Sequence, residues 1–385
     1  MTAPARLRMS RTALLPIVLF FGIGASSAVV CTLVYAMPPI IRIAGHGIRN
    51  VPETTLERPD DDLVRLRLLR QVRHLEAGKI EFHHIPPGNE ISDTYFALKE
   101  TLKELLKKNI LPIIIGGSKD LAFYNYLAYE ELEQTVNLVS IEPSFSIGNN
   151  EEELSSSNYL SKIILHQPNF LFNYSNIGYQ SYFTDPKEVH LLDELFFDSY
   201  RLGFIKKDIR ETEPVIRNAD ILVFDMAAIK QTDAPANLRP MPNGILSDEA
   251  CQLCRYAGMS DKLSSAGFYE MNPTVEDHGQ TASLLSQMIW YFIDGFYNRK
   301  KDFPACNKTE YKKYTVASEE GEEAVSFYKS GKSDRWWMDV PYNSGQSSKY
   351  KRHLMVPCSY KDYETAMNYE IPDRWFQTLK KLKDS

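Results

Sequence analysis

Residues 221–235 read Ile221-Leu222-Val223-Phe224-Asp225-Met226-Ala227-Ala228-Ile229-Lys230-Gln231-Thr232-Asp233-Ala234-Pro235. The apolar run that opens this stretch predicts a buried strand of a parallel sheet, because such strands are covered on both faces. Asp225 stands where the strand ends, and open α/β sheets bind ligands at the carboxyl ends of their strands. The same residue could instead cap the following turn, so the stretch alone leaves a functional and a structural interpretation open.

Strand and helix signals alternate on both sides of this stretch. Apolar runs predict strands at residues 111–115, 136–141, 171–177, 200–204 and 264–270. Apolar residues at helical spacing predict helices that begin at residues 59–62 and at Ser92 or Asp93, and others at residues 161–165, 188–195, 209–217 and 279–296. The solvated face of the second helix is expected to carry Lys99, Lys103, Lys107 and Lys108. This alternation predicts a mainly parallel sheet with helices on both faces.

The pattern changes near both ends of the chain. After residue 303 the sequence becomes rich in Tyr, Trp, Ser, Lys and Asp, and Trp336, Trp337 and Trp375 are candidate anchors. We expect residues 303–385 to form an extension that packs on the α/β body through aromatic rings, although those rings could instead bind a carbohydrate or a peptide. Three parts are therefore expected: an atypical apolar segment at 1–60, an α/β domain at 61–302 and this extension.

The N-terminal segment allows three interpretations. Basic residues at 6, 8 and 11 precede a strongly apolar run at residues 13–34, which is the pattern of a membrane anchor. Residues 17–22 could instead be the first strand of the sheet, or the segment could be an atypical start. The expected location is the cytoplasm, or the membrane if residues 13–34 are an anchor.

Composition narrows the class of protein. Hydrophobic residues make up 43% of the chain and charged residues 24%, which are globular values. A formal net charge of -6 gives no argument for a nucleic-acid partner. Five scattered cysteines favour a reducing compartment over a disulfide framework. Cys251 and Cys254 form a Cys-x-x-Cys pair, but we expect them in the middle of a helix, without a metal or redox role.

The stretch at 221–235 resembles the Ser-Phe-Asp-x-Asp-x-x-Asp-Pro-x-x-Ala-Pro signature of the ureohydrolase family (arginase, agmatinase, formimidoylglutamase). Asp225 stands at the first Asp of the signature, and Ala234 and Pro235 stand at its Ala-Pro. Ala227 and Lys230 stand where the family has its second and third Asp. The chain therefore keeps the spacing and the Ala-Pro of the signature, whereas two of its three Asp positions hold other residues.

Three further motifs carry the resemblance over residues 60–300. Gly116-Gly117-Ser118-Lys119-Asp120 stands at Gly-Gly-Asp-His-Ser, Ile141-Glu142-Pro143-Ser144-Phe145-Ser146 at Val-Asp-Ala-His-x-Asp, and Glu270-Met271-Asn272-Pro273 at Glu-Val-Asn-Pro. The resemblance implies an arginase-like three-layer α/β/α fold with a mainly parallel sheet. Within the family the chain is most similar to bacterial proteins of the formimidoylglutamase-like branch.

The resemblance also implies a metal chemistry, which this sequence does not support. The family holds two Mn²⁺ ions with two His and four Asp, and a bridging hydroxide attacks an amidine or guanidinium carbon. The matching positions here are Lys119, Glu142, Ser144, Ser146, Asp225 and Ala227, so Glu142 and Asp225 are the residual candidate metal ligands. Lys119 would place an ammonium where a cation binds, and like charges ~4 Å apart repel by about 4 kcal/mol at an effective dielectric constant near 20. We hypothesise that the Lys119 ammonium replaces the charge of the metal and pairs with Glu142 and Asp225.

Two functional hypotheses follow. The first is a non-catalytic binding or scaffolding protein with no cofactor, whose partner is a protein or a small cationic ligand. The second is a Mn²⁺-dependent hydrolase of linear amidine or guanidino C–N bonds. Glu270, which contacts the substrate in the family, is retained as the candidate substrate-binding residue. A membrane-tethered component and a homo-oligomer both remain open, and no histidine lies in a recognisable metal-binding motif.

Overall fold

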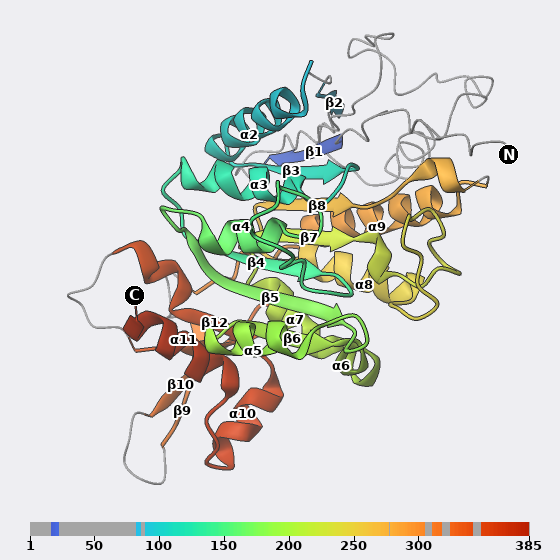
Figure 1. Cartoon of the computed structure of the whole chain (residues 1–385). Coiled ribbons are helices and arrows are strands. Elements are labelled where there is room, and N and C mark those ends of the chain that lie inside the picture. Colours follow the sequence, from blue (N-terminus) through green and yellow to red (C-terminus); the bar gives the residue numbers. More distant parts are fainter. Residues whose placement is uncertain are drawn as a thin grey trace, which may run out of the picture.

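The computed structural model describes residues 17–22, 82–85, 89–276, 278–304, 310–317, 324–341 and 348–384. Within these ranges the chain forms a large sheet covered by helices and a smaller antiparallel sheet near the C-terminus (Figure 1). The large sheet has eight strands in the order β2-β1-β3-β8-β7-β4-β5-β6. Its strands are β1 (Ile17–Gly22), β2 (Phe82–His84), β3 (Ile110–Ile115), β4 (Val136–Ile141), β5 (Leu171–Tyr179), β6 (Asp198–Arg201), β7 (Ile221–Asp225) and β8 (Ser265–Tyr269).

The large sheet is mainly parallel, as the sequence predicts. Neighbouring strands from β3 to β6 run parallel, whereas β1 is antiparallel to both β2 and β3. Successive side chains of a strand point to opposite faces of the sheet, so a continuous apolar strand buries residues on both faces. Ile113 and Ile115 of β3 join one apolar cluster, and Ile114 between them joins the other.

Each apolar cluster is completed by one layer of helices, so the predicted three-layer fold is confirmed. The first layer holds α2 (Ile91–Lys107), α3 (Leu121–Glu130), α4 (Tyr159–Leu165) and α5 (Pro186–Glu194). The second holds α6 (Leu202–Lys207), α7 (Thr212–Arg217), α8 (Ser247–Gly258) and α9 (Gln280–Tyr297). Short 3-10 turns at η2 (Ile209–Glu211), η3 (Met226–Ala228) and η4 (Pro273–Val275) complete the connections.

One predicted strand needs correction. The sequence predicts a strand over residues 200–204, but β6 ends at Arg201 and helix α6 begins at Leu202. Leu202 and Ile205 lie three residues apart and both enter the apolar core, which is helical spacing. The apolar run was therefore a short helix that follows a short strand.

The Cys-x-x-Cys pair lies in α8, as predicted. Cys251 and Cys254 are both buried free thiols. Burial raises the pKa of Cys251 to about 11 and that of Cys254 well above its ordinary value. Both thiols therefore stay protonated at neutral pH, the inert state of a buried cysteine.

The N-terminal predictions fall mostly outside the described residues. Residues 17–22 form β1, which is the strand interpretation of this segment. The rest of the run at 13–34, and the helix expected to begin at residues 59–62, lie outside the described ranges. In the part of the chain that the structure describes, no helix combines the length and apolar content needed to cross a membrane.

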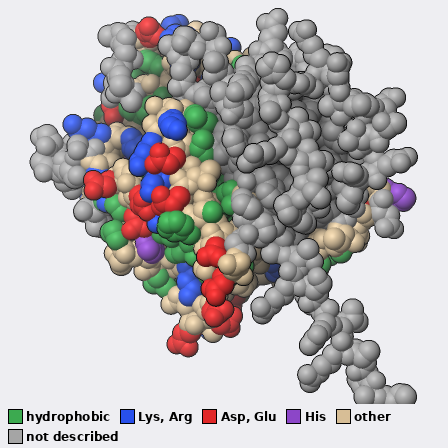
Figure 2. All heavy atoms as spheres, turned by 90° about the horizontal axis from the view of Figure 1, so that it is seen from above, with side chains coloured by type: hydrophobic (Ala, Val, Ile, Leu, Met, Phe, Trp, Pro, Cys, Tyr) green, Lys and Arg blue, Asp and Glu red, His purple; other side chains and the backbone are tan. Residues whose placement is uncertain are grey.

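The lysines of α2 lie at the surface, but their exposure differs: the side chain of Lys103 is 15% exposed and that of Lys107 is 48% exposed. Lys99 and Lys103 lie 2.5 and 2.8 Å from the carboxylate of Glu131, and Lys107 lies 3.2 Å from Glu104. In the view from above, Figure 2 shows basic and acidic side chains interspersed on the described part of the molecule rather than gathered by sign. This pattern is typical of exposed ion pairs and not of a binding patch.

The C-terminal extension forms a second sheet with its own core. Its strands run in the order β12-β11-β10-β9, and all neighbours are antiparallel. The elements are β9 (Tyr311–Val316), β10 (Val325–Ser330), β11 (Trp336–Asp339), η6 (Ser348–His353), β12 (Met355–Cys358), α10 (Tyr360–Met367) and α11 (Asp373–Asp384). Trp336 and Trp375 are buried in this core, and Phe172 of β5 joins it from the body. The ring of Phe172 lies 5.7 Å from that of Tyr350, whereas the ring partners of Trp336 are tyrosines of the extension. Because Trp337 is buried too, none of these rings is available to a carbohydrate.

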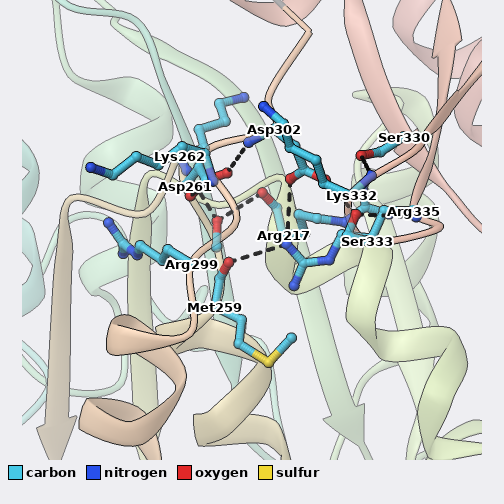
Figure 3. A network of polar contacts seen from close by, with 12 residues as sticks. Arg217, Met259, Asp261, Lys262, Arg299, Asp302, Ser330, Lys332, Ser333 and Arg335 are labelled. Atoms are coloured by element: carbon cyan, nitrogen blue, oxygen red, sulfur yellow. Dashed lines mark hydrogen bonds and ion pairs between the residues drawn. The ribbon is translucent and has the colours of Figure 1, made fainter. Parts of the chain in front are cut away.

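Two arginine side chains add a second attachment between the extension and the body. Arg217 of α7 donates to the carbonyl oxygens of Trp336 and Cys358, both at 3.2 Å, and its guanidinium lies 4.5 Å from the centre of a ring of Trp337. From the other side, Arg335 lies 3.1 Å from Glu213. It also donates to the carbonyl oxygen of Met259 (Figure 3). Because hydrogen bonds of charged donors are directional, they hold the extension on the body and also set its orientation.

Candidate functional site

The carboxyl ends of the central strands meet at one edge of the large sheet, and the motifs of the sequence lie there. Lys119 follows β3, Glu142 follows β4, and Asp225 is the last residue of β7. Gly116 and Gly117 connect β3 to Lys119 with φ angles of 94° and 74°. A residue with a Cβ is strained at such angles, so these glycines let the chain turn back toward the neighbouring strands.

Lys119 lies between the two residual carboxylates. Its Nζ is 2.9 Å from Oε2 of Glu142, 2.7 Å from Oδ2 of Asp225 and 2.9 Å from Oγ of Ser146. The side chains of Lys119, Glu142 and Asp225 are only 3%, 0% and 2% exposed. An ammonium has three donors, and these three partners account for all of them. The pairing predicted from the sequence is confirmed, and we call these four residues the Lys119 network.

Neutral donors add further hydrogen bonds to both carboxylates of the network. Tyr159 and Tyr174 donate to Oε1 of Glu142 at 2.9 and 3.2 Å, and Ser146 donates to its Oε2 at 2.8 Å. The backbone N–H of Ala227 donates to Oδ1 of Asp225 at 2.7 Å. Buried charge is tolerated when its hydrogen-bonding groups are paired in this way.

The protonation states of the network follow from burial and charge. Burial alone would lower the pKa of Lys119, but the attraction of Asp225 and Glu142 outweighs it and raises that pKa above its ordinary value. Burial, together with the charge of Glu142, raises the pKa of Tyr159 and Tyr174 well above the ordinary value. At neutral pH Lys119 is therefore a cation and both tyrosines are hydrogen-bond donors.

The side chains at this edge do not fit a pair of manganese ions. A protonated lysine has no lone pair to offer a metal, and the Lys119 ammonium lies between the two carboxylates that could ligate one. Ala227 carries no donor atom at another family ligand position. Over the ranges that the structure describes, no group of three or more His, Cys, Asp or Glu side chains is placed to hold a metal ion. Among the histidines, His166 is paired with Glu130 at 2.7 Å.

Glu270 lies beside the Lys119 network. It directly follows β8 with a left-handed φ of 65°, and its Oε1 accepts the backbone N–H of Lys119 at 3.0 Å. Its carbonyl oxygen accepts the side-chain amide of Asn237 at 2.8 Å. Burial and the nearby charge of Asp225 raise the pKa of Glu270, while Lys119 opposes this change. The structure thus places Glu270 at the same edge, and its role in binding substrate remains a prediction.

Sequence reasoning missed the two tyrosines. Tyr159 comes from α4 and Tyr174 from the middle of β5, and neither lies in a family motif. One signal was available, because a tyrosine within a buried strand needs a partner for its hydroxyl group. Which partner it meets depends on packing across strands, which the local sequence does not encode.

Comparison with known proteins agrees with this architecture. The model of the Arginase family matches residues 38–294, so the chain belongs to this family. Formimidoylglutamase of Staphylococcus aureus (strain MSSA476) is 26% identical over 189 residues, which cover 47% of this chain and 60% of that protein. The chain therefore matches less than two thirds of that relative's length. The comparison supports membership of the family and a resemblance to formimidoylglutamases.

Solved structures show the same fold. The crystal structure of Trypanosoma cruzi formiminoglutamase with Mn²⁺ superposes with a TM-score of 0.55 and 15% identity, over 61% of this chain and 86% of that one. Formimidoylglutamase of Bacillus subtilis gives a TM-score of 0.54 and 13% identity, over 64% and 85% of the two chains. At such low identity the similarity describes the fold and carries no statement about activity.

Proposed function

We propose that this chain is a non-catalytic member of the Arginase family that serves as a binding or scaffolding protein. In this proposal the Lys119 ammonium stands in place of the catalytic metal charge. The observation that carries the proposal is the position of Lys119 Nζ, 2.9 Å from Glu142 and 2.7 Å from Asp225. The pattern of substitutions at the family motifs supports the same conclusion.

The chemistry of amidine hydrolysis supports the loss of activity. Hydrolysis of this kind needs an activated water, which a bound metal supplies by lowering the pKa of that water to about 7. The Lys119 network has no equivalent, because its ammonium donates to three partners and both carboxylates are paired with it. Neither Glu142 nor Asp225 is free to act as a general base toward water.

Electrostatics oppose metal binding beside Lys119. A unit charge and a divalent ion ~4 Å apart repel by about 8 kcal/mol at an effective dielectric constant near 20. A metal could therefore bind only if it displaced the ammonium from Glu142 and Asp225. That displacement would leave a lysine in an apolar interior without its partners, which is itself unfavourable.

A binding role is supported by the surface next to the network. Loops at the carboxyl edge expose Tyr182, Phe183 and Leu238, and Tyr182 is 91% exposed. The side chain of Gln180 donates to the carbonyl oxygen of Asn243, which joins two of these loops. Exposed aromatic side chains are enriched at surfaces that bind partners. The partner class stays as predicted, a protein or a small cationic ligand, and attachment to a membrane through residues 13–34 stays a hypothesis.

The test is a hydrolysis assay on the full chain after incubation with excess Mn²⁺. Formimidoylglutamate, arginine and agmatine are the substrates, and the staphylococcal formimidoylglutamase assayed in parallel is the positive control for formimidoylglutamate. The proposal expects no turnover above buffer for any of the three. Turnover that depends on Mn²⁺ would contradict the proposal and favour the hydrolase hypothesis.

A thermal-shift series with agmatine tests the cationic-ligand form of the binding role. A ligand that binds only the folded state raises the melting temperature. The expected result is a rise for the native chain and none for Glu270→Gln, without any hydrolysis. An equal rise in both proteins would exclude Glu270 from the ligand site.

A further inference from the structure

A buried histidine joins the C-terminal extension to the body at the opposite, amino edge of the large sheet. His353, the last residue of η6, is 2% exposed, and its ring stacks on Phe172 of β5 with centroids 4.1 Å apart. Nε2 lies 3.0 Å from Oγ1 of Thr135, and Nδ1 lies 3.5 Å from Nζ of Lys262. We call these four residues the His353 contact.

The hydrogen bonds assign the state of the ring. Oγ1 of Thr135 donates to the carbonyl oxygen of Lys349 at 3.2 Å, so it accepts from the Nε2–H of His353. Nδ1 then keeps its lone pair and faces the ammonium of Lys262. The ring is therefore neutral. A second proton would have to bind to Nδ1, which faces the Lys262 ammonium.

The charged groups around His353 are mostly positive. Lys262 comes from the loop between α8 and β8, Arg352 from η6 itself, and Lys381 from α11. Asp220, directly before β7, is the carboxylate that both Arg352 and Lys262 contact, and its distance to Lys262 Nζ is 3.8 Å. One more positive charge at this position would thus face three cations and one carboxylate that is already shared.

We propose that the His353 contact is an acid-sensitive attachment that holds the C-terminal extension on the α/β body and loosens when the ring is protonated. Protonation would replace the acceptor at Nδ1 with an N–H that faces the Lys262 ammonium. It would also place a charge on a ring that is stacked against Phe172 in a site closed to water. This inference does not depend on whether the carboxyl edge is catalytic.

The pH window follows from the direction of the shift. Burial lowers the pKa of His353 well below its ordinary value, and Lys262 and Arg352 lower it further. The stability that the neutral ring contributes is complete above about pH 6.5, the ordinary histidine value, and is lost as the pH falls below it. Burial also lowers the pKa of Lys262 and Lys381 to about 8, so their contributions change at alkaline pH, outside the histidine window.

Tryptophan emission gives a direct readout on the full chain. Three of the four tryptophans, Trp336, Trp337 and Trp375, lie in the extension. Emission and hydrogen exchange of residues 348–358 are measured at pH 7.5 and 5.0, with exchange of α9 as the internal reference. The native chain is expected to show red-shifted emission and faster exchange of residues 348–358 at pH 5.0, while α9 keeps its protection.

Two variants separate titration of His353 from general acid effects. His353→Gln keeps an amide that can donate to Thr135 and accept from Lys262 but cannot titrate, so its emission should not change with pH. His190→Gln is the matched control, because that side chain is 73% exposed, and it should respond as the native chain does. The proposal would be overturned if the emission and hydrogen exchange of the native chain were the same at pH 5.0 and 7.5. It would also be overturned if His353→Gln responded to pH as strongly as the native chain.

If the extension of the His353→Gln variant does not pack on the body at pH 7.5, a histidine NMR titration of the native chain tests the proposal instead. The proposal expects the His353 signal to titrate below pH 6.5, together with the loss of protection at residues 348–358. A His353 signal that titrates while the protection stays unchanged would overturn it.

Discussion

The two edges of the large sheet each hold a buried charge cluster, and the two clusters have opposite composition. At the carboxyl edge a single cation, Lys119, lies between the carboxylates of Glu142 and Asp225. At the amino edge a single carboxylate, Asp220, lies between the cations of Arg352 and Lys262. The first cluster connects loops within the body, whereas the second connects the body to the C-terminal extension.

The clusters also differ in access to water. All three charged side chains of the Lys119 network are at most 3% exposed. At the amino edge Asp220 and Lys262 are 0% and 4% exposed, but the Arg352 side chain is 30% exposed. A charge that can reach water recovers part of its hydration when its partner is removed. The Lys119 network should therefore contribute more to stability than the cluster at the amino edge. Its contribution should also change less with pH near neutrality.

Lys119→Met should give the largest effect. The substitution keeps much of the side-chain volume but leaves Glu142 and Asp225 as buried carboxylates without a cation. Breaking a buried ion pair in this way costs about 3–5 kcal/mol. Urea unfolding at pH 7 measures the change, and Lys107→Met is the matched control, because the Lys107 side chain is 48% exposed. A loss below about 1 kcal/mol would show that the network does not hold the strand ends together.

Asp220→Asn should give a smaller loss at the amino edge. The amide keeps the shape but removes the charge that Arg352 and Lys262 share, while Arg352 can turn toward water. We expect a loss of about 2 kcal/mol, together with red-shifted tryptophan emission as the extension loosens. Equal losses for this variant and for Lys119→Met would remove the proposed difference between the two edges.

Tyr159→Phe should give a smaller loss still. It removes the hydroxyl that donates to Oε1 of Glu142, but Tyr174 still donates to that oxygen. A hydrogen bond to a charged group contributes about 1.5–3 kcal/mol, and the remaining donor places the expected loss near the lower value. Tyr182→Phe, at a residue that is 91% exposed, should leave the free energy of unfolding unchanged.

The contribution of Lys119 should not change with pH near neutrality. Because its pKa is raised in the folded state, its stabilisation is complete below the ordinary lysine value of about 10.4 and is lost only as the pH rises above it. The difference in unfolding free energy between the native chain and Lys119→Met should therefore be constant from pH 6 to 9. A difference that shrinks over this range would mean that Lys119 is not held as a cation.

Most of the α/β body could be predicted because its signals are local. The strand predicted at 136–141 coincides with β4, and the one at 264–270 differs from β8 by one residue at each end. The error at residues 202–204 arose because a helix of six residues is too short to show its period clearly. The second sheet was predicted only as an extension, since strands of four to six residues give weak patterns.

The Lys119 network could be predicted because its charged members stand at or just after the ends of strands that meet at the same edge. The supporting hydroxyls of Tyr159 and Tyr174 could not, because they depend on which helix and strand pack beside Glu142. His353 gave no sequence signal beyond a histidine of unknown burial. Its contact joins residues that are far apart in the chain, Thr135, Lys262 and His353, and only the docked extension brings them together.

Metal content tests the central claim most directly. The full chain is incubated with excess Mn²⁺, desalted and measured by elemental analysis. The Trypanosoma cruzi formiminoglutamase, whose crystal structure contains Mn²⁺, is treated in the same way as a control for loading. Because Lys119 lies between Glu142 and Asp225, we predict a manganese content near zero per chain. A content near two ions per chain would mean that the metal displaces the ammonium, and it would contradict the proposal that this chain is a non-catalytic member of its family.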